Sequence, residues 1–118
     1  MGVRTSAVFS NDEELYAEVE EASERACEKI WRLPLDKELF PVIESEVADI
    51  QNSAQGSTMG GGAIVAGLFL QEFVEDHSWV HVDIAPVSWE SKDIDYSIKG
   101  ATGYGVSLLY ETVKVISR

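Results

Sequence analysis

The stretch Ser78-Trp79-Val80-His81-Val82-Asp83-Ile84-Ala85 decides the fold, because its side chains alternate between two kinds. Alternate residues of an extended chain point to opposite faces of a sheet. One face is apolar and carries Val80, Val82 and Ile84, and the other carries Trp79, His81, Asp83 and Ala85. The alternation predicts a central strand. We expect its apolar face to lie in a core against the apolar helix predicted over residues 63–74.

The N-terminal part predicts a strand followed by a helix. Residues 3–9 are rich in β-branched and aromatic side chains, which is typical of a strand. Ser10 and Glu13 have the spacing of a capping box, so we expect a helix from near Asn11. Its apolar positions are Leu15, Val19, Ala22, Ala26 and Ile30, with an acidic, solvated face opposite. Pro34 ends this helix within residues 31–35.

The middle of the chain predicts a short helix, a strand, a loop and a buried helix. Residues 36–44 indicate the short helix, which Pro41 bends or interrupts. Residues 46–51 alternate well enough for a strand. Residues 52–62 form a polar, glycine-rich loop, and residues 63–74 are apolar nearly all round, which is typical of a buried helix.

The C-terminal part predicts a polar loop over residues 87–98 and a last helix. That helix follows Gly103 and Gly105, and its apolar residues fall on one stripe: Val106, Leu109, Tyr110, Val113 and Ile116. The resulting order is β-α-α-β-α-β-α. We therefore expect an α/β fold, a mixed sheet of about three strands with flanking helices, as a single segment over residues 1–118.

Composition excludes several functional classes. The 118 residues hold 9 Lys and Arg against 21 Asp and Glu, so the net charge is −12. Nucleic-acid binding needs clusters of basic residues, and acidic membranes repel such a chain, so we expect neither partner. The longest apolar run, 63–70, is too short to span a bilayer. Cys27 is the only cysteine, which fits a reducing cytoplasm.

Four features could carry chemistry, and each has a simpler explanation. Gly60-Gly61-Gly62 ahead of a helix could bind phosphate, or could form a turn that lets a buried helix pack closely. His81 and Asp83 could act in base catalysis or metal binding, or could form a buried hydrogen-bonded pair. Cys27 is a nucleophile or a small core residue, and we favour the latter. Asp49 alone cannot form a metal site, and His77 is expected in an exposed loop.

The residues alone therefore give an acidic α/β domain without a complete catalytic set, and a resemblance takes the interpretation further. Six collinear blocks resemble the leucyl aminopeptidase (cytosol aminopeptidase) family. They are Val8-Phe9-Ser10-Asn11-Asp12, Trp31-Arg32-Leu33-Pro34-Leu35, Ala48-Asp49-Ile50-Gln51-Asn52, Gly61-Gly62-Ala63-Ile64 with Phe69-Leu70-Gln71-Glu72-Phe73-Val74, Trp79 to Ala85, and Lys99-Gly100-Ala101-Thr102-Gly103.

The resemblance implies the C-terminal part of the catalytic domain of a two-metal exopeptidase. Such enzymes remove N-terminal amino acids from peptides, use zinc, manganese or magnesium, and form hexamers in the cytoplasm. The family's metal ligands and catalytic residues belong to motifs absent from this sequence. We therefore expect no catalytic residue and no metal site in this chain, inactivity of the chain by itself, and a homo-oligomer.

The resemblance also assigns two pocket residues. In the family, the alanine that ends the His-x-Asp-Ile-Ala strand and the residue three positions later line the pocket for the substrate's first side chain. These positions are Ala85 and Ser88, which leave room for a leucine-sized group, with Pro86 in place of the family's usual glycine. The alternative is a stand-alone, non-enzymatic interaction module derived from the same fold. In either case we expect association through an exposed edge strand, 3–9, or an uncovered apolar face.

Overall fold

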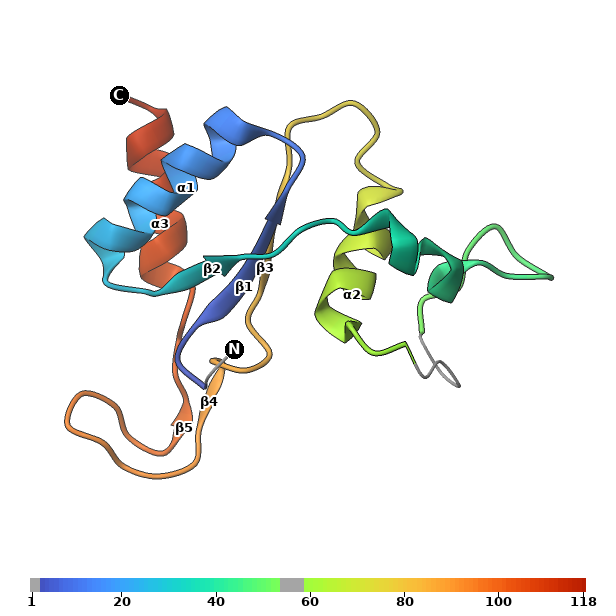
Figure 1. The fold of residues 1–118 in the computed structure, drawn as a ribbon. Helices are drawn as coiled ribbons and strands as arrows, with labels where there is room; N and C mark the ends of the chain where they lie inside the picture. The colour runs from blue at the N-terminus through green and yellow to red at the C-terminus, as the bar shows by residue number, and fades with distance from the viewer. Residues whose placement is uncertain (1–2, 54–58) are drawn as a thin grey trace.

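The computed structural model describes residues 3–53 and 59–118, and Figure 1 shows their arrangement. In chain order the elements are β1 (Ser6–Ser10), α1 (Glu13–Ala26), β2 (Ile30–Arg32), the 3-10 helix η1 (Lys37–Ile43), α2 (Gly62–Gln71), β3 (Val80–Asp83), β4 (Trp89–Glu90), β5 (Gly100–Ala101) and α3 (Val106–Ile116). Within these described ranges, none of the helices combines the length and apolarity needed to cross a membrane.

The sheet is mixed and three-stranded, as predicted. Its order is β2-β1-β3, with β2 parallel and β3 antiparallel to β1. Val8 of β1 lies opposite Arg32 on one side and Val82 on the other. Every residue of β1 is buried, so the expectation that residues 3–9 form an edge strand is wrong. The edges of this sheet are β2 and β3, and β4 and β5 pair separately.

Helices α1 and α3 lie side by side on one face of the sheet (Figure 1). Val80 and Val82 pack against the core that these two helices form, together with Ile30. The buried members of this core are Val19, Ala22, Leu108 and Val115. The prediction that these two valines face a core is therefore confirmed. The prediction that the helix over residues 63–74 forms this core is wrong, because α1 and α3 form it. Ile84 lies beyond the end of β3 and is 42% exposed, so its expected burial is also wrong.

Helix α2 and η1 form a second core on the opposite side of the sheet. Its buried members are Val42, Ile43, Val65 and Leu68. A Cβ on Gly67 would lie only 3.2 Å from Phe9 Cγ and 3.3 Å from Leu35 Cδ2, so only glycine permits this approach of α2 to β1. Phe9 and Val8 alternate along β1, which explains why Phe9 faces α2 while its neighbour faces away.

Helix α1 is shorter at both ends than the sequence predicts. Asp12 caps it by accepting the Leu15 N–H at 2.9 Å, whereas Ser10 Oγ accepts the N–H of Asp12, so the predicted capping box is wrong. Cys27 adopts a left-handed conformation with φ 54°, and its own N–H and that of Glu28 close the last turn. Such a cap ends a helix. Residues 30–32 therefore form β2, and Cys27 is exposed, not a core residue.

The strand predicted over residues 46–51 is absent from the described structure. Ser45 Oγ accepts the N–H groups of Val47 and Ala48 at 3.3 and 3.1 Å, which holds this segment in a turn. Val47 is 97% exposed. Gln51 then returns to η1, where its side-chain amide donates to the Val42 carbonyl at 2.8 Å.

The glycines before α2 form a turn in which Gly61 packs closely against Leu39 of η1. Gly60 and Gly61 both have φ 70°, which favours glycine. A Cβ on Gly61 would lie 2.7 Å from Leu39 Cδ1. Of the predicted loop over 52–62, residues 54–58 lie outside the described residues.

The side of helix α3 that lies in the core is not the apolar stripe that the sequence pattern shows. Leu108 and Val115 point into the core and are 1% and 2% exposed. The apolar stripe that the periodicity selected lies on the outside, with exposed fractions between 49% and 71%. We call these residues the outer α3 stripe, and they are Val106, Leu109, Tyr110, Val113 and Ile116.

Candidate functional site

The residues predicted to line a pocket lie on a tight turn directly after β3. The N–H groups of Val87 and Ser88 both donate to the Ile84 carbonyl, at 3.0 and 2.9 Å. The Ala85 N–H donates to Asp83 Oδ1 at 3.0 Å. The turn therefore brings Ala85, which is exposed, close to Ser88, which is half-buried, with Ser88 Oγ 3.5 Å from the Ala85 carbonyl.

Thr102 fixes this turn from a distant part of the chain. Its hydroxyl donates to the Val87 carbonyl at 2.7 Å, and its N–H donates to the Ser88 carbonyl at 3.0 Å. The pairing of β4 with β5 continues from this contact, so residues 89–101 form a hairpin whose base is anchored. The turn is thus held at both ends, by Asp83 in β3 and by Thr102. A surface built this way is preorganised for contact with another group.

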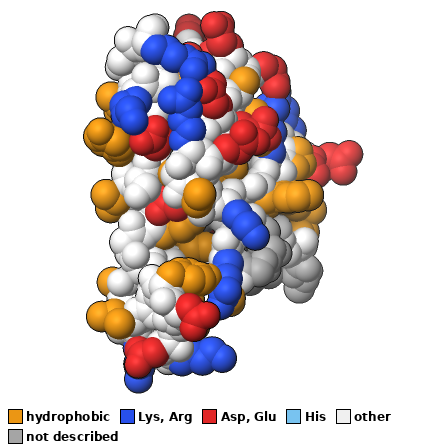
Figure 2. Space-filling view, turned by 90° about the vertical axis from the view of Figure 1, so that its left-hand side faces the viewer, with side chains coloured by type: hydrophobic (Ala, Val, Ile, Leu, Met, Phe, Trp, Pro, Cys, Tyr) orange, Lys and Arg blue, Asp and Glu red, His pale blue; other side chains and the backbone are white. Residues whose placement is uncertain are grey.

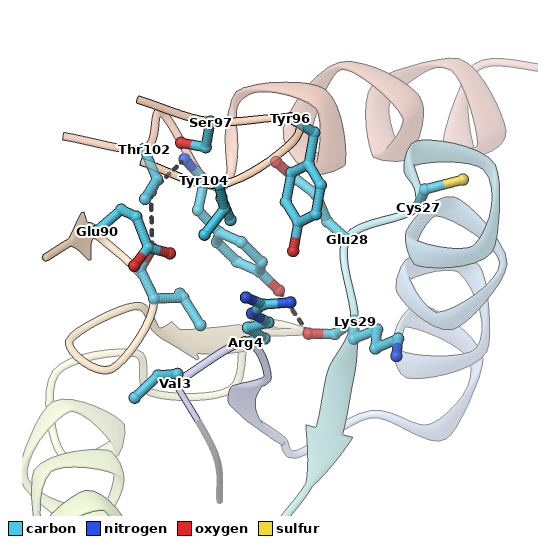
Figure 3. A pocket seen from close by; sticks show the side chains of 12 residues that line it. Val3, Arg4, Cys27, Glu28, Lys29, Glu90, Tyr96, Ser97, Thr102 and Tyr104 are labelled. Atoms are coloured by element: carbon cyan, nitrogen blue, oxygen red, sulfur yellow. Dashed lines mark hydrogen bonds between the residues drawn. The ribbon is translucent and has the colours of Figure 1, made fainter. Parts of the chain in front are cut away.

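A cavity of about 360 Å³ lies beside this turn and is drawn in Figure 3. Most of its lining comes from the segment before β1, the connection from α1 to β2 and the hairpin 89–101. Val87 lines it, but Ala85 and Ser88 do not. Residues of both charges line it, and these are Arg4, Lys29, Glu28 and Glu90.

Polar groups of this cavity already have structural partners. The Tyr104 hydroxyl donates to the Lys29 carbonyl at 2.7 Å (Figure 3). Burial raises the pKa of Tyr104, and the nearby charge of Glu28 adds to this, so the hydroxyl keeps its proton. Glu28 accepts the N–H groups of Gly105 and Leu108 at the start of α3, at 3.1 and 2.9 Å. Tyr104 and Glu28 therefore have structural roles beside the cavity.

His81 and Asp83 do not form the hydrogen-bonded pair that the sequence suggested. The His81 ring stacks on Phe9 and Trp79, with ring centres 5.8 and 6.1 Å apart. Burial lowers the pKa of His81, and the charge of Asp83 opposes that shift. Asp83 accepts the N–H of Ala85. The histidine therefore belongs to the aromatic packing, and the aspartate supports the turn.

The other candidate ligands are scattered. Asp49 and His77 are both exposed, and His77 is in a loop as predicted. Over residues 3–53 and 59–118 no three His, Cys, Asp or Glu side chains come together to hold a metal ion. The donor set of these residues does not fit a metal centre.

Three residues that organise the site were not predicted as such. Thr102 and Tyr104 flank Gly103, which has φ 69°, and Gly105 follows with φ 99°. Both angles favour glycine, so this segment has a specialised backbone. That glycine pattern is a signal that could have indicated them. Glu28 gave no such signal, because its partner Gly105 is 77 residues away along the chain.

Comparison with known proteins identifies the family. The catalytic-domain profile of the cytosol aminopeptidase family matches residues 1–110. A probable cytosol aminopeptidase of Synechococcus sp. (strain JA-3-3Ab) is 46% identical over 113 residues, which cover 96% of this chain and 22% of the relative. A second, from Alkaliphilus metalliredigens (strain QYMF), is 43% identical over 121 residues and is covered to 23%. The chain thus spans less than a quarter of these relatives' length.

Solved structures give the same result for the fold. The bottromycin maturation enzyme BotP in complex with Mn has a TM-score of 0.91 and 37% identity, over 98% of this chain and 25% of that one. A tomato leucine aminopeptidase mutant has a TM-score of 0.82 and 38% identity, over 100% of this chain and 22% of that one. The described fold corresponds to a C-terminal part of the aminopeptidase catalytic domain. The chain belongs to the cytosol aminopeptidase family.

Proposed function

We propose that residues 1–118 act as one segment of a metal-dependent aminopeptidase and form part of its substrate pocket. The observation that carries this proposal is the turn after β3, which Asp83 and Thr102 hold from two sides. Ala85 and Ser88 would face the first side chain of a peptide substrate. The small side chains of both residues leave space for a group the size of leucine.

Metal chemistry would come from outside these residues. Two divalent ions held close together can polarise the scissile carbonyl and supply a hydroxide at neutral pH. The described residues do not fit such a site, so the ligands and catalytic groups would belong to the remaining part of the catalytic domain. The 118-residue chain by itself would therefore bind no catalytic metal and hydrolyse no peptide. The Mn in the BotP complex supports the choice of a divalent metal.

Assembly and location follow from the same proposal. The relatives carry the name cytosol aminopeptidase, which supports a cytoplasmic location. A homo-oligomer of the complete enzyme, a hexamer by family resemblance, would be the working form. Peptides are its substrates, and nucleic acid and membranes are not its partners. Light scattering of a complete enzyme that contains this segment would measure the assembly.

A chimeric enzyme tests the proposal. The matched segment of tomato leucine aminopeptidase is replaced by residues 1–118, and hydrolysis of leucine amide is measured with and without a chelator. We expect chelator-sensitive activity in the chimera and none in the 118-residue chain supplied with Mn²⁺. A chimera that assembles like the unmodified host but hydrolyses nothing would reject the proposed function.

A substitution in the chimera tests the pocket assignment. Ala85→Trp should raise KM for leucine amide roughly tenfold or more, because the indole would occupy the space of the leucine side chain. Glycine amide should be affected less. Ala17→Trp makes the same change on the exposed face of α1 and should leave both substrates unaffected. If the two variants have the same KM for leucine amide, Ala85 does not line the pocket.

A further inference from the structure

The hydroxyl of Thr102 links the turn after β3 to the main sheet. It donates to the Val87 carbonyl at 2.7 Å and accepts the N–H of Tyr104 at 3.2 Å. The Tyr104 hydroxyl donates to the Lys29 carbonyl at 2.7 Å, and this carbonyl also accepts the N–H of Ser6 at 3.1 Å. Hydrogen bonds that follow one another in a chain strengthen each other. The turn is therefore connected by hydrogen bonds to the first residue of β1.

The other end of the turn is connected to that same residue. Ser6 Oγ donates to the Asp83 carbonyl, and Asp83 Oδ1 accepts the N–H of Ala85. Ser6 is 0% exposed and belongs to the central strand of the sheet. The two connections of the turn therefore end on one buried residue, and the position of Ala85 between them depends on both.

The cavity beside the turn decides what loss of the Thr102 hydroxyl would do. Thr102 and Val87 both line this cavity, and so do the exposed residues Arg4 and Tyr96, which means that water can enter it. Figure 2 shows basic and hydrophobic side chains at the surface between helices α1 and α3 above and the hairpin below. A water molecule can satisfy the Val87 carbonyl in place of the hydroxyl, but it cannot hold that carbonyl in position. The turn would therefore lose a positional constraint while the domain stays folded.

The position of the turn matters because a pocket wall selects by its fit to the substrate. Groups that line a binding site have to be held within about 0.5 Å of the productive geometry. Leucine at the start of a peptide would reach the wall formed by Ala85 and Ser88, whereas glycine has no side chain to do so. Resting on the proposed function, we propose that Thr102 is a positioning residue for substrate selection. Its hydroxyl holds Ala85 and Ser88 where an aliphatic N-terminal side chain is preferred to glycine.

The preference of the chimera for leucine amide over glycine amide tests this role. Thr102→Val removes the hydroxyl and keeps a branched side chain. The kcat/KM for leucine amide divided by that for glycine amide should fall roughly fivefold or more, chiefly because KM for leucine amide rises. Thr102→Ser retains the hydroxyl and should keep this ratio within about twofold of the parent value.

Thr112→Val is the matched control for the loss of a threonine hydroxyl. Thr112 is half-buried like Thr102, and its hydroxyl also donates to a carbonyl at 2.7 Å, that of Leu108 within α3. This variant should leave the leucine-to-glycine ratio unchanged. If Thr102→Val does not assemble, Thr102→Ala, which also lacks the hydroxyl, takes its place.

Amide hydrogen exchange in the 118-residue chain tests the positioning without any activity. The N–H groups of Val87 and Ser88 donate within the turn, so their exchange reports its opening. Thr102→Val should speed this exchange roughly tenfold, whereas Thr102→Ser and Thr112→Val should not.

The two measurements separate the ways in which the proposals can fail. Unchanged exchange at Val87 and Ser88 in Thr102→Val would overturn the inference, because the hydroxyl would not hold the turn. Faster exchange with an unchanged ratio would also overturn it, and so would an equal loss of activity toward both amides, which a purely structural role produces. A chimera that hydrolyses neither amide rejects the proposed function and the selectivity that rests on it, whereas faster exchange would still show that Thr102 holds the turn.

Discussion

Helices α1 and α3 lie on the same face of the same sheet and share one core, yet their outer sides differ completely. The outer side of α1 carries charged side chains, including Glu14, Glu20 and Glu24, all exposed. The outer side of α3 carries the outer α3 stripe, with Val113 as exposed as Leu109, at 64%.

The difference teaches that the two helices are adapted to different surroundings. A charged outer face is hydrated at little cost, so α1 is suited to contact with water. An apolar outer face gains free energy only when another apolar surface excludes water from it. The helix pair therefore presents one outer surface suited to water and one that would be stabilised by contact with another apolar surface.

The largest expected effect is a difference in the free energy of unfolding between substitutions on the two sides of α3. Leu108→Ala should lower the free energy of unfolding by about 2–5 kcal/mol, because Leu108 is buried in the core and its loss leaves a cavity. Leu109→Ala, the neighbouring leucine in the stripe, should change it by less than about 0.5 kcal/mol in the 118-residue chain. Urea unfolding followed by circular dichroism measures both. Equal losses would show that α3 is rotated relative to this description.

A smaller effect concerns the contact that joins the two helices at their ends. Glu28→Ala should cost about 1–2 kcal/mol, because the carboxylate accepts N–H groups of the first turn of α3. Glu28→Gln retains one acceptor and should lose less. Glu24→Ala, which removes an exposed carboxylate of α1, is the control and should be nearly neutral. Thermal melts of the three variants test this, and a neutral Glu28→Ala would contradict the capping role.

The start of α1 should make stability depend on acid. The hydrogen bond from Ser78, and next the Leu15 N–H, hold the pKa of Asp12 below its ordinary value of 3.8. A lowered carboxyl pKa stabilises the fold above the unfolded-state value, and this contribution is lost as pH falls through the folded-state value. The melting temperatures of the parent chain and of Asp12→Ala should therefore differ near neutral pH and converge below pH 3.8. A constant difference would exclude the carboxylate as the cause.

Ser78→Ala tests whether Ser78 lowers the pKa of Asp12. It removes the largest contribution to the lowered pKa while leaving Asp12 in place as the cap. The acid-dependent loss should then be smaller, and it should be complete at a higher pH than in the parent chain. An unshifted profile would mean that Ser78 does not set this pKa.

The smallest effect lies at the other end of α1. Cys27 has φ 54°, which strains any residue with a Cβ. Cys27→Gly should therefore raise the free energy of unfolding by about 0.5 kcal/mol, after the greater freedom of glycine in the unfolded chain is subtracted. Cys27→Ala keeps the Cβ and should give no gain. Chemical denaturation of both variants distinguishes them, and a gain from alanine would point to the thiol instead of the backbone.

The hydrophobic pattern was sufficient to predict those helices and strands in which one face is apolar and the other is polar. The alternation from Val80 to Asp83 correctly predicted β3, and the stripe from Leu15 to Ala26 correctly predicted α1. Ile30 is not part of α1, although its spacing continues the helical period, because the left-handed Cys27 has already ended the helix. Residues 46–51 alternate but have no strand to pair with, so a turn held by Ser45 replaces the expected strand.

Helix α3 shows why periodicity alone could not choose the core face. Leu108 and Val115 on one side, and Leu109 and Val113 on the other, are all apolar, so the pattern fits either orientation. Contacts with α1 and the sheet select the first pair. For the site, Ala85 and Ser88 came from family resemblance, because small side chains on a turn carry no chemical signature. Contacts across the whole chain, such as Glu28 with Gly105, have no local pattern at all.

The two hydrogen bonds from Thr102 to the turn after β3 bear on which residues can change without moving that turn. Thr102 holds the Val87 and Ser88 carbonyls at the base of the hairpin, so these two hydrogen bonds do not involve the hairpin tip. Tyr96 and Ser97 near the tip line the cavity of Figure 3, but make no contact that fixes Ala85 in the network described above. Sequence drift or insertions in residues 91–99 can therefore reshape the cavity while the turn stays in place. The part of the cavity that Val87 and Thr102 line stays with the turn, and only the part lined by the hairpin tip can change separately.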